Sequence, residues 1–164
     1  MNLPLRLAKI AMTASLALLA FLVAFGNITD YGSNFAFVQH VLSMDTTFPD
    51  NTLRWRAITN PVLWHIFYWL IILAEAATCA AYAIGTASLL RHLRADTATF
   101  NRAKRPIYVA TTLGFLVWFL GFMVIGGEWF AMWQSKIWNG QEAAFRFTVT
   151  ILAVGIFVAQ GDRK

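Results

Sequence analysis

The sequence predicts an all-α fold, a four-helix transmembrane bundle. Four segments are apolar over about 20 residues, the length that an α-helix needs to cross the hydrocarbon of a bilayer. They span about residues 5–25, 61–90, 107–127 and 141–160. The composition agrees, because 59% of the 164 residues are hydrophobic and 13% are charged, which is about half the charged share of soluble domains. We therefore expect residues 1–164 to form a single integral membrane domain in a lipid bilayer.

Basic residues predict how the four spans are oriented. The loop between the second and third spans carries Arg91, Arg94, Arg102, Lys104 and Arg105. Such enrichment in Lys and Arg is typical of the cytoplasmic side, and basic residues also follow the fourth span, at Arg163 and Lys164. We therefore expect a multi-pass protein with both termini in the cytoplasm. The same rule accounts for the net charge of +5, so we expect no nucleic-acid partner.

The first span begins in the way that signal peptides also begin, with Arg6 and Lys9 ahead of an apolar core. However, no convincing small-x-small cleavage site precedes Gly26, and three further apolar segments follow. We expect a retained transmembrane helix. Its polar side chains, Thr13 and Ser15, can hydrogen-bond to the helix backbone.

The connection over residues 27–60 is long but rich in aromatic and aliphatic residues, which predicts that it is ordered. Apolar residues within 34–45 recur at helical spacing: Phe37, Val38, Val41 and Leu42. This spacing predicts a short amphipathic helix. Residues 53–58 form a second short segment suited to the membrane interface. The topology places residues 27–60 and 128–140 on the non-cytoplasmic side, and we name them the outer cap.

The second span carries a carboxylate in the middle of an apolar run. Asn60 can cap this helix, and Pro61 suits its first position. Glu75 must face a partner, the protein interior or a water-filled cavity, because hydrocarbon does not tolerate a charge. Polar residues continue the same helical face: Thr78, Cys79, Tyr82 and Thr86. This face is either a path for protons or a substrate, or a structural feature in which a neutral Glu75 hydrogen-bonds within the bundle, since desolvation favours the protonated carboxyl group.

Small and aromatic residues mark the third span and the segment after it. Gly114 and Gly121 are seven residues apart, which predicts a shared helical face that lets a neighbouring backbone approach closely. Trp129, Trp133 and Trp138 follow. Amphipathic indole rings prefer the membrane interface, so we expect these three at the outer boundary.

Arg146, near the start of the fourth span, has two candidate partners. Glu142 lies one turn earlier, in the order that favours a helical ion pair. Glu128 or an acidic loop residue would instead join the two segments of the outer cap. The sequence leaves both alternatives open. We do not expect a pair with Glu75, because roughly 12 Å of helical rise separates the two residues.

Unusual strings of sequence are distributed between residues 27 and 141. They are NITDY at 27–31, Asn34, FV at 37–38, HVL at 40–42, MDT at 44–46, WRAI at 55–58, GGEWFAMWQS at 126–135 and WNGQ at 138–141. In these strings the chain resembles a bacterial family described as predicted small integral membrane proteins, domain of unknown function 2165. The resemblance implies a four-span bacterial membrane protein, and we expect it in the inner (cytoplasmic) membrane. It supplies no catalytic residues and no assigned reaction.

Two histidines invite a redox hypothesis, because imidazole is the commonest nitrogen ligand of metals and haem. His65 lies near the outer end of the second span and His40 in the outer cap, but no metal-ligand spacing connects them. Phosphate-binding loops and nucleophile elbows are also absent from the sequence. Cys79 is the single cysteine, so it forms no intrachain disulfide, and we expect an inert thiol in apolar surroundings. We predict no catalytic residue, metal ligand or cofactor.

We predict a non-enzymatic membrane protein that is an accessory or scaffold subunit of a larger inner-membrane assembly, or that self-associates. The reason is that aromatic and arginine residues, which suit interfaces, concentrate in the outer cap. The candidate interface residues are Asp30, Tyr31, Asn34, His40, Asp45, Trp55, Arg56, His65, Glu128, Trp129, Trp133, Trp138 and Arg146. One alternative is a small transporter or proton-coupled carrier that uses Glu75. Another is a haem-, metal- or quinone-binding redox protein that uses His65 or His40.

Overall fold

The computed structural model describes residues 2–162, and its secondary structure over that range is entirely helical. Four helical segments are long and apolar enough to cross a membrane. They are α1 (Leu3–Thr29), α3 (Pro61–Arg91), the combined segment Thr97–Trp129 and α6 (Gln141–Ala159). The predicted fold class is therefore confirmed. The basic residues predicted to follow the fourth span, Arg163 and Lys164, lie outside the described residues.

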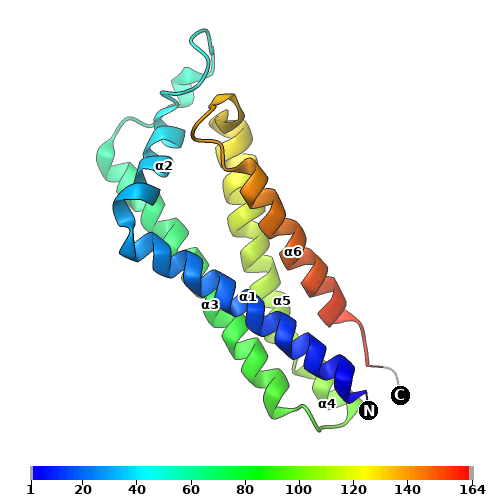
Figure 1. Ribbon diagram of the computed structural model, residues 1–164. Helices are drawn as coiled ribbons and strands as arrows, with labels where there is room; N and C mark the ends of the chain where they lie inside the picture. The colour runs from blue at the N-terminus through cyan, green and yellow to red at the C-terminus, as the bar shows by residue number, and fades with distance from the viewer. Residues whose placement is uncertain (1, 163–164) are drawn as a thin grey trace.

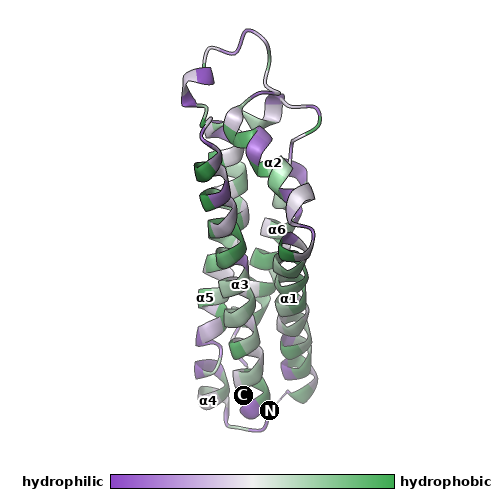
Figure 2. Ribbon diagram, turned by 90° about the vertical axis from the view of Figure 1, so that its left-hand side faces the viewer, coloured by the Kyte–Doolittle hydropathy of each residue, from purple (hydrophilic) through white to green (hydrophobic). Residues whose placement is uncertain are grey.

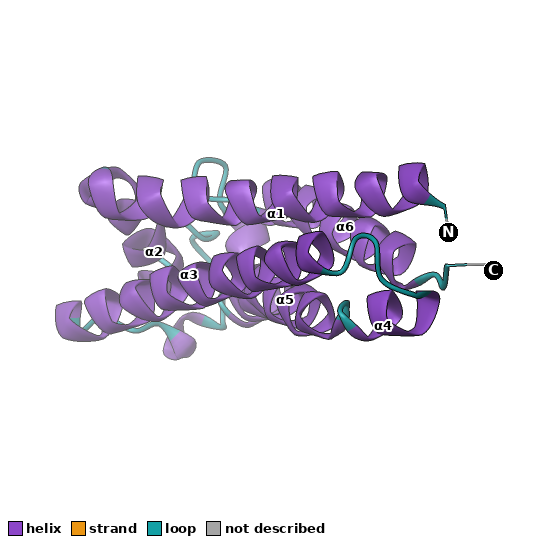
Figure 3. Ribbon diagram, turned by 90° about the horizontal axis from the view of Figure 1, so that it is seen from below, coloured by secondary structure: helices purple, strands orange, loops and turns teal. Residues whose placement is uncertain are grey.

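The long segments form an elongated antiparallel bundle (Figure 1). α1 packs along α3, α3 packs along α5 (Arg105–Phe115), and α6 packs against α5 and its continuation η2 (Leu116–Trp129). α1 begins and α6 ends at the same end of the bundle, beside the short α4 (Thr97–Arg102) (Figure 1, Figure 3). We name this end, which carries the arginine-rich residues 91–105, the basic end. Its location on the cytoplasmic side stays a prediction.

The ends and polar residues of the helices follow the sequence signals. The Asn60 side chain accepts a hydrogen bond from the Val62 N–H, and Pro61 occupies the first turn of α3, as predicted. Within α1, the hydroxyl groups of Thr13 and Ser15 donate to backbone carbonyls three or four residues earlier. These two hydroxyl groups are therefore satisfied inside the helix, as a bilayer requires.

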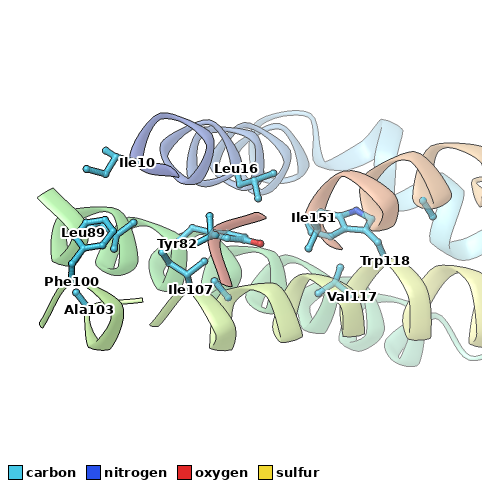
Figure 4. Packing of buried hydrophobic residues seen from close by; sticks show 13 residues of the cluster. Ile10, Leu16, Tyr82, Leu89, Phe100, Ala103, Ile107, Val117, Trp118 and Ile151 are labelled. Atoms are coloured by element: carbon cyan, nitrogen blue, oxygen red, sulfur yellow. The ribbon is translucent and has the colours of Figure 1, made fainter. Parts of the chain in front are cut away.

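Buried apolar side chains from the long segments form the bundle core. Figure 4 labels several of them: Ile10 and Leu16 of α1, Tyr82 and Leu89 of α3, Phe100 of α4, Ile107 of α5, Val117 and Trp118 of η2, and Ile151 of α6. The outward faces are apolar as well, since Leu18, Leu73, Ile84 and Ile156 are each more than half exposed. Figure 2 shows hydrophobic residues along the long helices and hydrophilic residues toward both ends. Helices that are apolar on all sides suit lipid rather than water.

The third span changes its winding halfway, where the α-helix α5 continues as the 14-residue π-helix η2. This change corrects the prediction that Gly114 and Gly121 share a contact face. A Cβ on Gly114 would lie 2.9 Å from Cδ1 of Ile151 on α6. A Cβ on Gly121 would meet no other helix within 4 Å among residues 2–162, because its neighbour within that distance is the carbonyl oxygen of Leu116 in its own helix. A seven-residue spacing gives a common face only with α-helical winding, and the π-helix begins between the two glycines.

The outer cap folds over the end of the bundle opposite the basic end. Its predicted amphipathic helix is confirmed as α2 (Tyr31–Ser43), which buries Val38, Val41 and Leu42. The other short elements are η1 (Arg54–Arg56) and η3 (Met132–Gln134). The two cap segments are joined, because the Thr46 hydroxyl donates to the Ser135 hydroxyl at 2.9 Å and the Phe48 N–H donates to the Gln134 side chain at 3.1 Å.

Candidate functional site

Glu75 lies on the inward face of α3. The buried residues of this helix recur every three or four positions: Tyr68, Ile72, Glu75, Thr78, Tyr82, Gly85 and Leu89. Glu75 is only 1% exposed. The helical register therefore turns the carboxyl group into the bundle and away from lipid.

The last turn of α1 supplies the partner of Glu75. The Asn27 amide nitrogen donates to Glu75 Oε2 at 2.7 Å. The Tyr68 hydroxyl, seven residues before Glu75, donates to the Asn27 carbonyl oxygen at 3.0 Å. Its distance to Asn27 Oδ1 is 3.4 Å. Tyr68 therefore holds Asn27 in position, and the Asn27 amide contacts Glu75 on the same helix, α3. Among the described residues, Asn27 is the only hydrogen-bond donor to Glu75.

A hollow of about 220 Å³ lies beside this carboxyl group. Its polar lining comes from Asn27, Asn34, Tyr68 and Glu75, and its apolar lining comes mainly from α2, η2 and α6. We name it the Glu75 hollow. It is a partly open space inside the bundle in which a polar group can meet a carboxyl group.

A larger hollow of about 380 Å³ lies next to the first and is lined almost entirely by apolar side chains of α2, α3, α5 and η2. The two hollows share Phe37, Val38, Ile71 and Phe122 in their linings. We name the second one the apolar hollow. Together they place a hydrogen-bonding group beside space suited to hydrocarbon, an arrangement found in sites for small molecules.

The other polar residues predicted on the face of Glu75 make separate contacts. The Thr78 hydroxyl donates to the Ala74 carbonyl oxygen in its own helix at 2.8 Å. The Tyr82 hydroxyl lies 3.2 Å from the Thr111 hydroxyl of α5, and the Cys79 thiol is half-buried. Among the described residues, no hydrogen bond connects Glu75 to these side chains. The structure instead brings Glu75 together with Asn27 and Tyr68.

The two histidines belong to different side-chain pairs. His65 Nδ1 lies 2.7 Å from the Tyr31 hydroxyl, and its ring stacks on Phe35 with the centroids 4.1 Å apart. Burial raises the pKa of Tyr31, so this hydroxyl keeps its proton at neutral pH. His40 Nδ1 lies 2.8 Å from the Asp45 carboxylate. Residues 2–162 contain no group of three or more His, Cys, Asp or Glu side chains that could hold a metal ion.

The remaining His40 contact and the arginine contacts lie in the aromatic part of the outer cap. The His40 ring stacks on Trp138 at 4.7 Å. Arg56 donates to the Trp129 carbonyl oxygen at 3.2 Å and lies over the Trp129 and Trp55 rings, 4.4 Å and 5.3 Å from their centroids. These contacts hold η1 against the end of η2. They leave much of the Trp55 ring, which is 71% exposed, on the surface.

The other predicted cap residues lie mostly at the surface. Arg146 pairs with Glu142, the first of its two predicted alternatives, and both side chains are exposed. Glu128 and Trp133 are exposed as well, and the Trp133 ring meets Phe48 edge to face. Asp30 joins α1 to α2, and its carbonyl oxygen accepts a long hydrogen bond of 3.5 Å from the Asn34 side chain.

Two sets of residues do not follow from the sequence patterns described above. The first is the pair Asn27 and Tyr68, although Tyr68 lies two helical turns before Glu75 on the same face. The second is a cluster of charged side chains at the basic end, because flanking charges alone account for Arg6 and Lys9 in the sequence. Their register with the buried Thr13 was the available signal, since all three lie on one face of α1.

Comparison with known proteins identifies the family. A family model described as "Predicted small integral membrane protein (DUF2165)" matches residues 5–161. The chain belongs to this family. As a DUF2165 member it is an integral membrane protein, and its four apolar helices supply the spans. No curated protein and no solved structure matches this DUF2165 chain.

Proposed function

We propose that this DUF2165 protein is a non-enzymatic membrane protein that binds a small ligand in the Glu75 hollow, as a small carrier would. The observation that supports this function is a buried carboxyl group on the wall of a hollow, held by a single side-chain amide. Ionisable groups inside membrane spans commonly mark paths for substrates, ions or protons.

The environment of Glu75 indicates the class of ligand. One neutral amide offsets little of the free energy of burying an ionised carboxylate, so that form needs a positive charge or further hydrogen-bond donors. A bound proton, a cation or the donor group of a small molecule supplies them. The apolar hollow would take the hydrocarbon part of an amphiphilic ligand. This role is the carrier alternative predicted from the sequence, and it uses the same residue.

Native mass spectrometry of the protein, gently extracted from its own membrane, tests this function. The wild-type spectrum should contain a bound small molecule. Glu75→Gln keeps the shape of the side chain and removes its charge, so the affinity should fall about tenfold, the effect of losing roughly 1.4 kcal/mol, and the bound fraction should fall with it. Glu128→Gln, an exposed change in the outer cap, should bind like the wild type. A wild-type spectrum without a bound small molecule would contradict the proposal, and so would equal binding by the Glu75→Gln and Glu128→Gln variants.

A flux measurement distinguishes a carrier from a protein that only binds. A proton-coupled carrier should acidify the interior of proteoliposomes when the mixture released from the wild-type protein is added outside. The Glu75→Gln variant should not do so, because the titrating group is absent. Binding without flux would show that the protein binds the ligand but does not carry it across the membrane. Flux by the Glu75→Gln variant would exclude Glu75 as the residue that couples transport to protons.

A second candidate function, an accessory or scaffold subunit of a larger assembly in the bacterial inner membrane, is favoured by the exposed outer cap. Trp55 and Ile137 are 71% and 77% exposed, and Trp129 and Trp133 are about half exposed. Tryptophan and arginine are enriched at protein interfaces, although they also anchor helices at the headgroup region. The same native spectrum tests this role. If the protein is such a subunit, the wild-type spectrum should contain a bound second subunit or a second copy of the chain. The spectrum of a Trp55→Ala variant should lack it.

A further inference from the structure

Four charged side chains are buried together at the basic end. Arg6 and Lys9 come from the start of α1, Lys104 precedes α5, and Asp162 follows α6. We name these four residues the basic-end cluster. Arg6 and Lys9 are fully buried, Lys104 is 1% exposed and Asp162 is 7% exposed. The cluster contains three positive charges and one negative charge.

Arg6 is the centre of the cluster. Its Nε donates to Asp162 Oδ2 at 2.5 Å, and its Nη1 donates to the carbonyl oxygens of Leu93 and Ala95 at 2.8 and 2.7 Å. The guanidinium group lies 4.2 Å from the centroid of the Phe100 ring. Its Nη2 is buried and finds no hydrogen-bond partner among residues 2–162. A buried, unsatisfied donor of a charged group is costly and points to a missing acceptor.

The two lysines reach the segment that follows α6. Lys9 Nζ donates to the Gln160 carbonyl oxygen at 2.5 Å and lies 3.4 Å from Asp162 Oδ1. Lys104 Nζ donates to the same carbonyl oxygen at 2.8 Å and to the Asn101 side chain at 2.7 Å. Carbonyl dipoles near the end of α6 compensate part of the positive charge. Among residues 2–162, only the Asp162 carboxylate offers the cluster a full negative charge.

Asp162 is ionised in this environment. Burial alone would raise its pKa, but the hydrogen bond from Arg6 and the charge of Lys9 outweigh burial and lower it. A carboxylate therefore occupies a pocket of cationic donors. It belongs to residues 160–162, which lie beyond the last helical residue, Ala159, so they can move without unwinding α6.

We propose that the basic-end cluster is a binding site for a phosphate group, which takes the place of the Asp162 carboxylate. A phosphate group offers enough acceptor oxygens for the planar fork of Arg6, including Nη2, and for the Lys9 ammonium group. The site lies where the first candidate span, α1, begins, and a bilayer around the four spans would bring lipid headgroups close to it. The phosphate belongs to an anionic lipid or is free in solution, and its chemistry is the same in both cases.

The test uses the full chain in a neutral detergent and three probes: inorganic phosphate, short-chain phosphatidylglycerol and short-chain phosphatidylcholine. The rise of the melting temperature with probe concentration, at constant ionic strength, gives the affinity. Asp162→Asn removes the internal competitor, so it should bind about fivefold tighter, as expected when a nearby like charge is removed. Glu128→Gln makes the same change of net charge far from the cluster and should have no effect.

Variants of the cations complete the experiment. Arg6→Gln should weaken binding about tenfold, the effect of losing a charge-assisted hydrogen bond, while Arg91→Gln, which removes an exposed arginine of the same end, should not. If Arg6→Gln does not fold, Arg6→Lys keeps the charge but loses the fork, and it should bind several-fold more weakly. Tighter binding by Asp162→Asn with phosphatidylglycerol alone assigns a lipid, and tighter binding with inorganic phosphate assigns the free ion.

Three results would overturn the proposal. The first is that neither inorganic phosphate nor phosphatidylglycerol stabilises the protein more than phosphatidylcholine does. The second is that Asp162→Asn binds no more tightly than the wild type, which would give Asp162 a purely structural role. The third is that Arg91→Gln loses as much affinity as the Arg6 variant, which would indicate diffuse attraction to a basic surface.

Discussion

Glu75 depends on one hydrogen bond from a neighbouring helix, and this dependence is measurable. Asn27→Ala removes the amide that donates to Glu75 Oε2. It should lower the free energy of unfolding by about 1–3 kcal/mol, because a buried acceptor loses its protein partner. Asn34→Ala is a matched control, since Asn34 lines the same hollow but makes no hydrogen bond to Glu75, and it should cost less than about 0.5 kcal/mol. Unfolding in mixed micelles gives both values.

A double-mutant cycle then separates this bond from general packing. If the bond carries the effect, Asn27→Ala should cost less in a Glu75→Gln background, with a coupling of about 0.5–3 kcal/mol. Equal costs of Asn27→Ala and Asn34→Ala in the wild type would mean that the amide contributes nothing specific to Glu75.

The sequence alone indicates the Glu75 carboxyl group but not its partners, Asn27 and Tyr68. A carboxylate in the middle of an apolar run is visible in the sequence alone, and so is its helical face. Asn27 is 48 residues away in another helix, and the packing angle of α1 on α3 decides whether its amide reaches Oε2. No spacing in the sequence encodes that angle.

The contact of α3 with α5 depends on a glycine. A Cβ on Gly85 would lie 2.5 Å from Ile107 Cγ1 and 3.3 Å from the Ile107 backbone nitrogen. Gly85→Ala should therefore separate the helices and destabilise the protein by about 1–3 kcal/mol, the usual cost of overpacking. A Cβ on Gly26 in α1 would meet no atom of another element within 4 Å in the described part of the chain, so Gly26→Ala should be neutral or slightly stabilising. Denaturation curves of the two variants check this, and similar stabilities would contradict the close approach.

The segment that follows α6 is held at the basic end by a pH-sensitive contact. The pKa of folded Asp162 lies below its ordinary value of 3.8, so ionised Asp162, facing Arg6, Lys9 and Lys104, stabilises the folded state above that pH. This stabilisation is lost as the pH falls through the folded pKa. The melting temperature of the wild type should exceed that of Asp162→Asn at pH 6. The difference should shrink below pH 3.8, and a difference that grows there would contradict the ion pair.

The helices themselves were predictable because length, apolarity and capping are local properties. The outer-cap helix followed from the spacing of Val38, Val41 and Leu42. The π-helix did not, because its 14 residues are apolar at nearly every position and so carry no periodic signal. The predicted role of Gly121 was wrong for this reason, whereas Gly114, which lies before the change of winding, does contact α6.

The distribution of arginine and lysine predicts the orientation of the whole molecule in the membrane, with the basic end in the cytoplasm. Arg102→Cys and Trp133→Cys, each in a Cys79→Ser background, place single thiols at opposite ends of the bundle. In intact cells a membrane-impermeant maleimide should label position 133 and not position 102, since arginine-rich loops stay in the cytoplasm. Labelling of both positions from the same side would contradict the four-span topology.

The basic-end cluster forms only in the complete fold. Arg6 and Asp162 are 156 residues apart, and they meet because both ends of the chain return to one end of the bundle. From the sequence, each charge is explained well enough by membrane topology alone. What the structure adds is their shared burial, which only the assembled molecule provides.

The most direct test of the Glu75 hollow is a density map of the protein purified from its native membrane. A non-protein feature should lie inside the hollow, within hydrogen-bond distance of the Glu75 carboxyl group, and it should be absent from a map of the Glu75→Gln variant. A hollow that holds only water, or that is closed by rearranged side chains in both maps, would contradict this prediction.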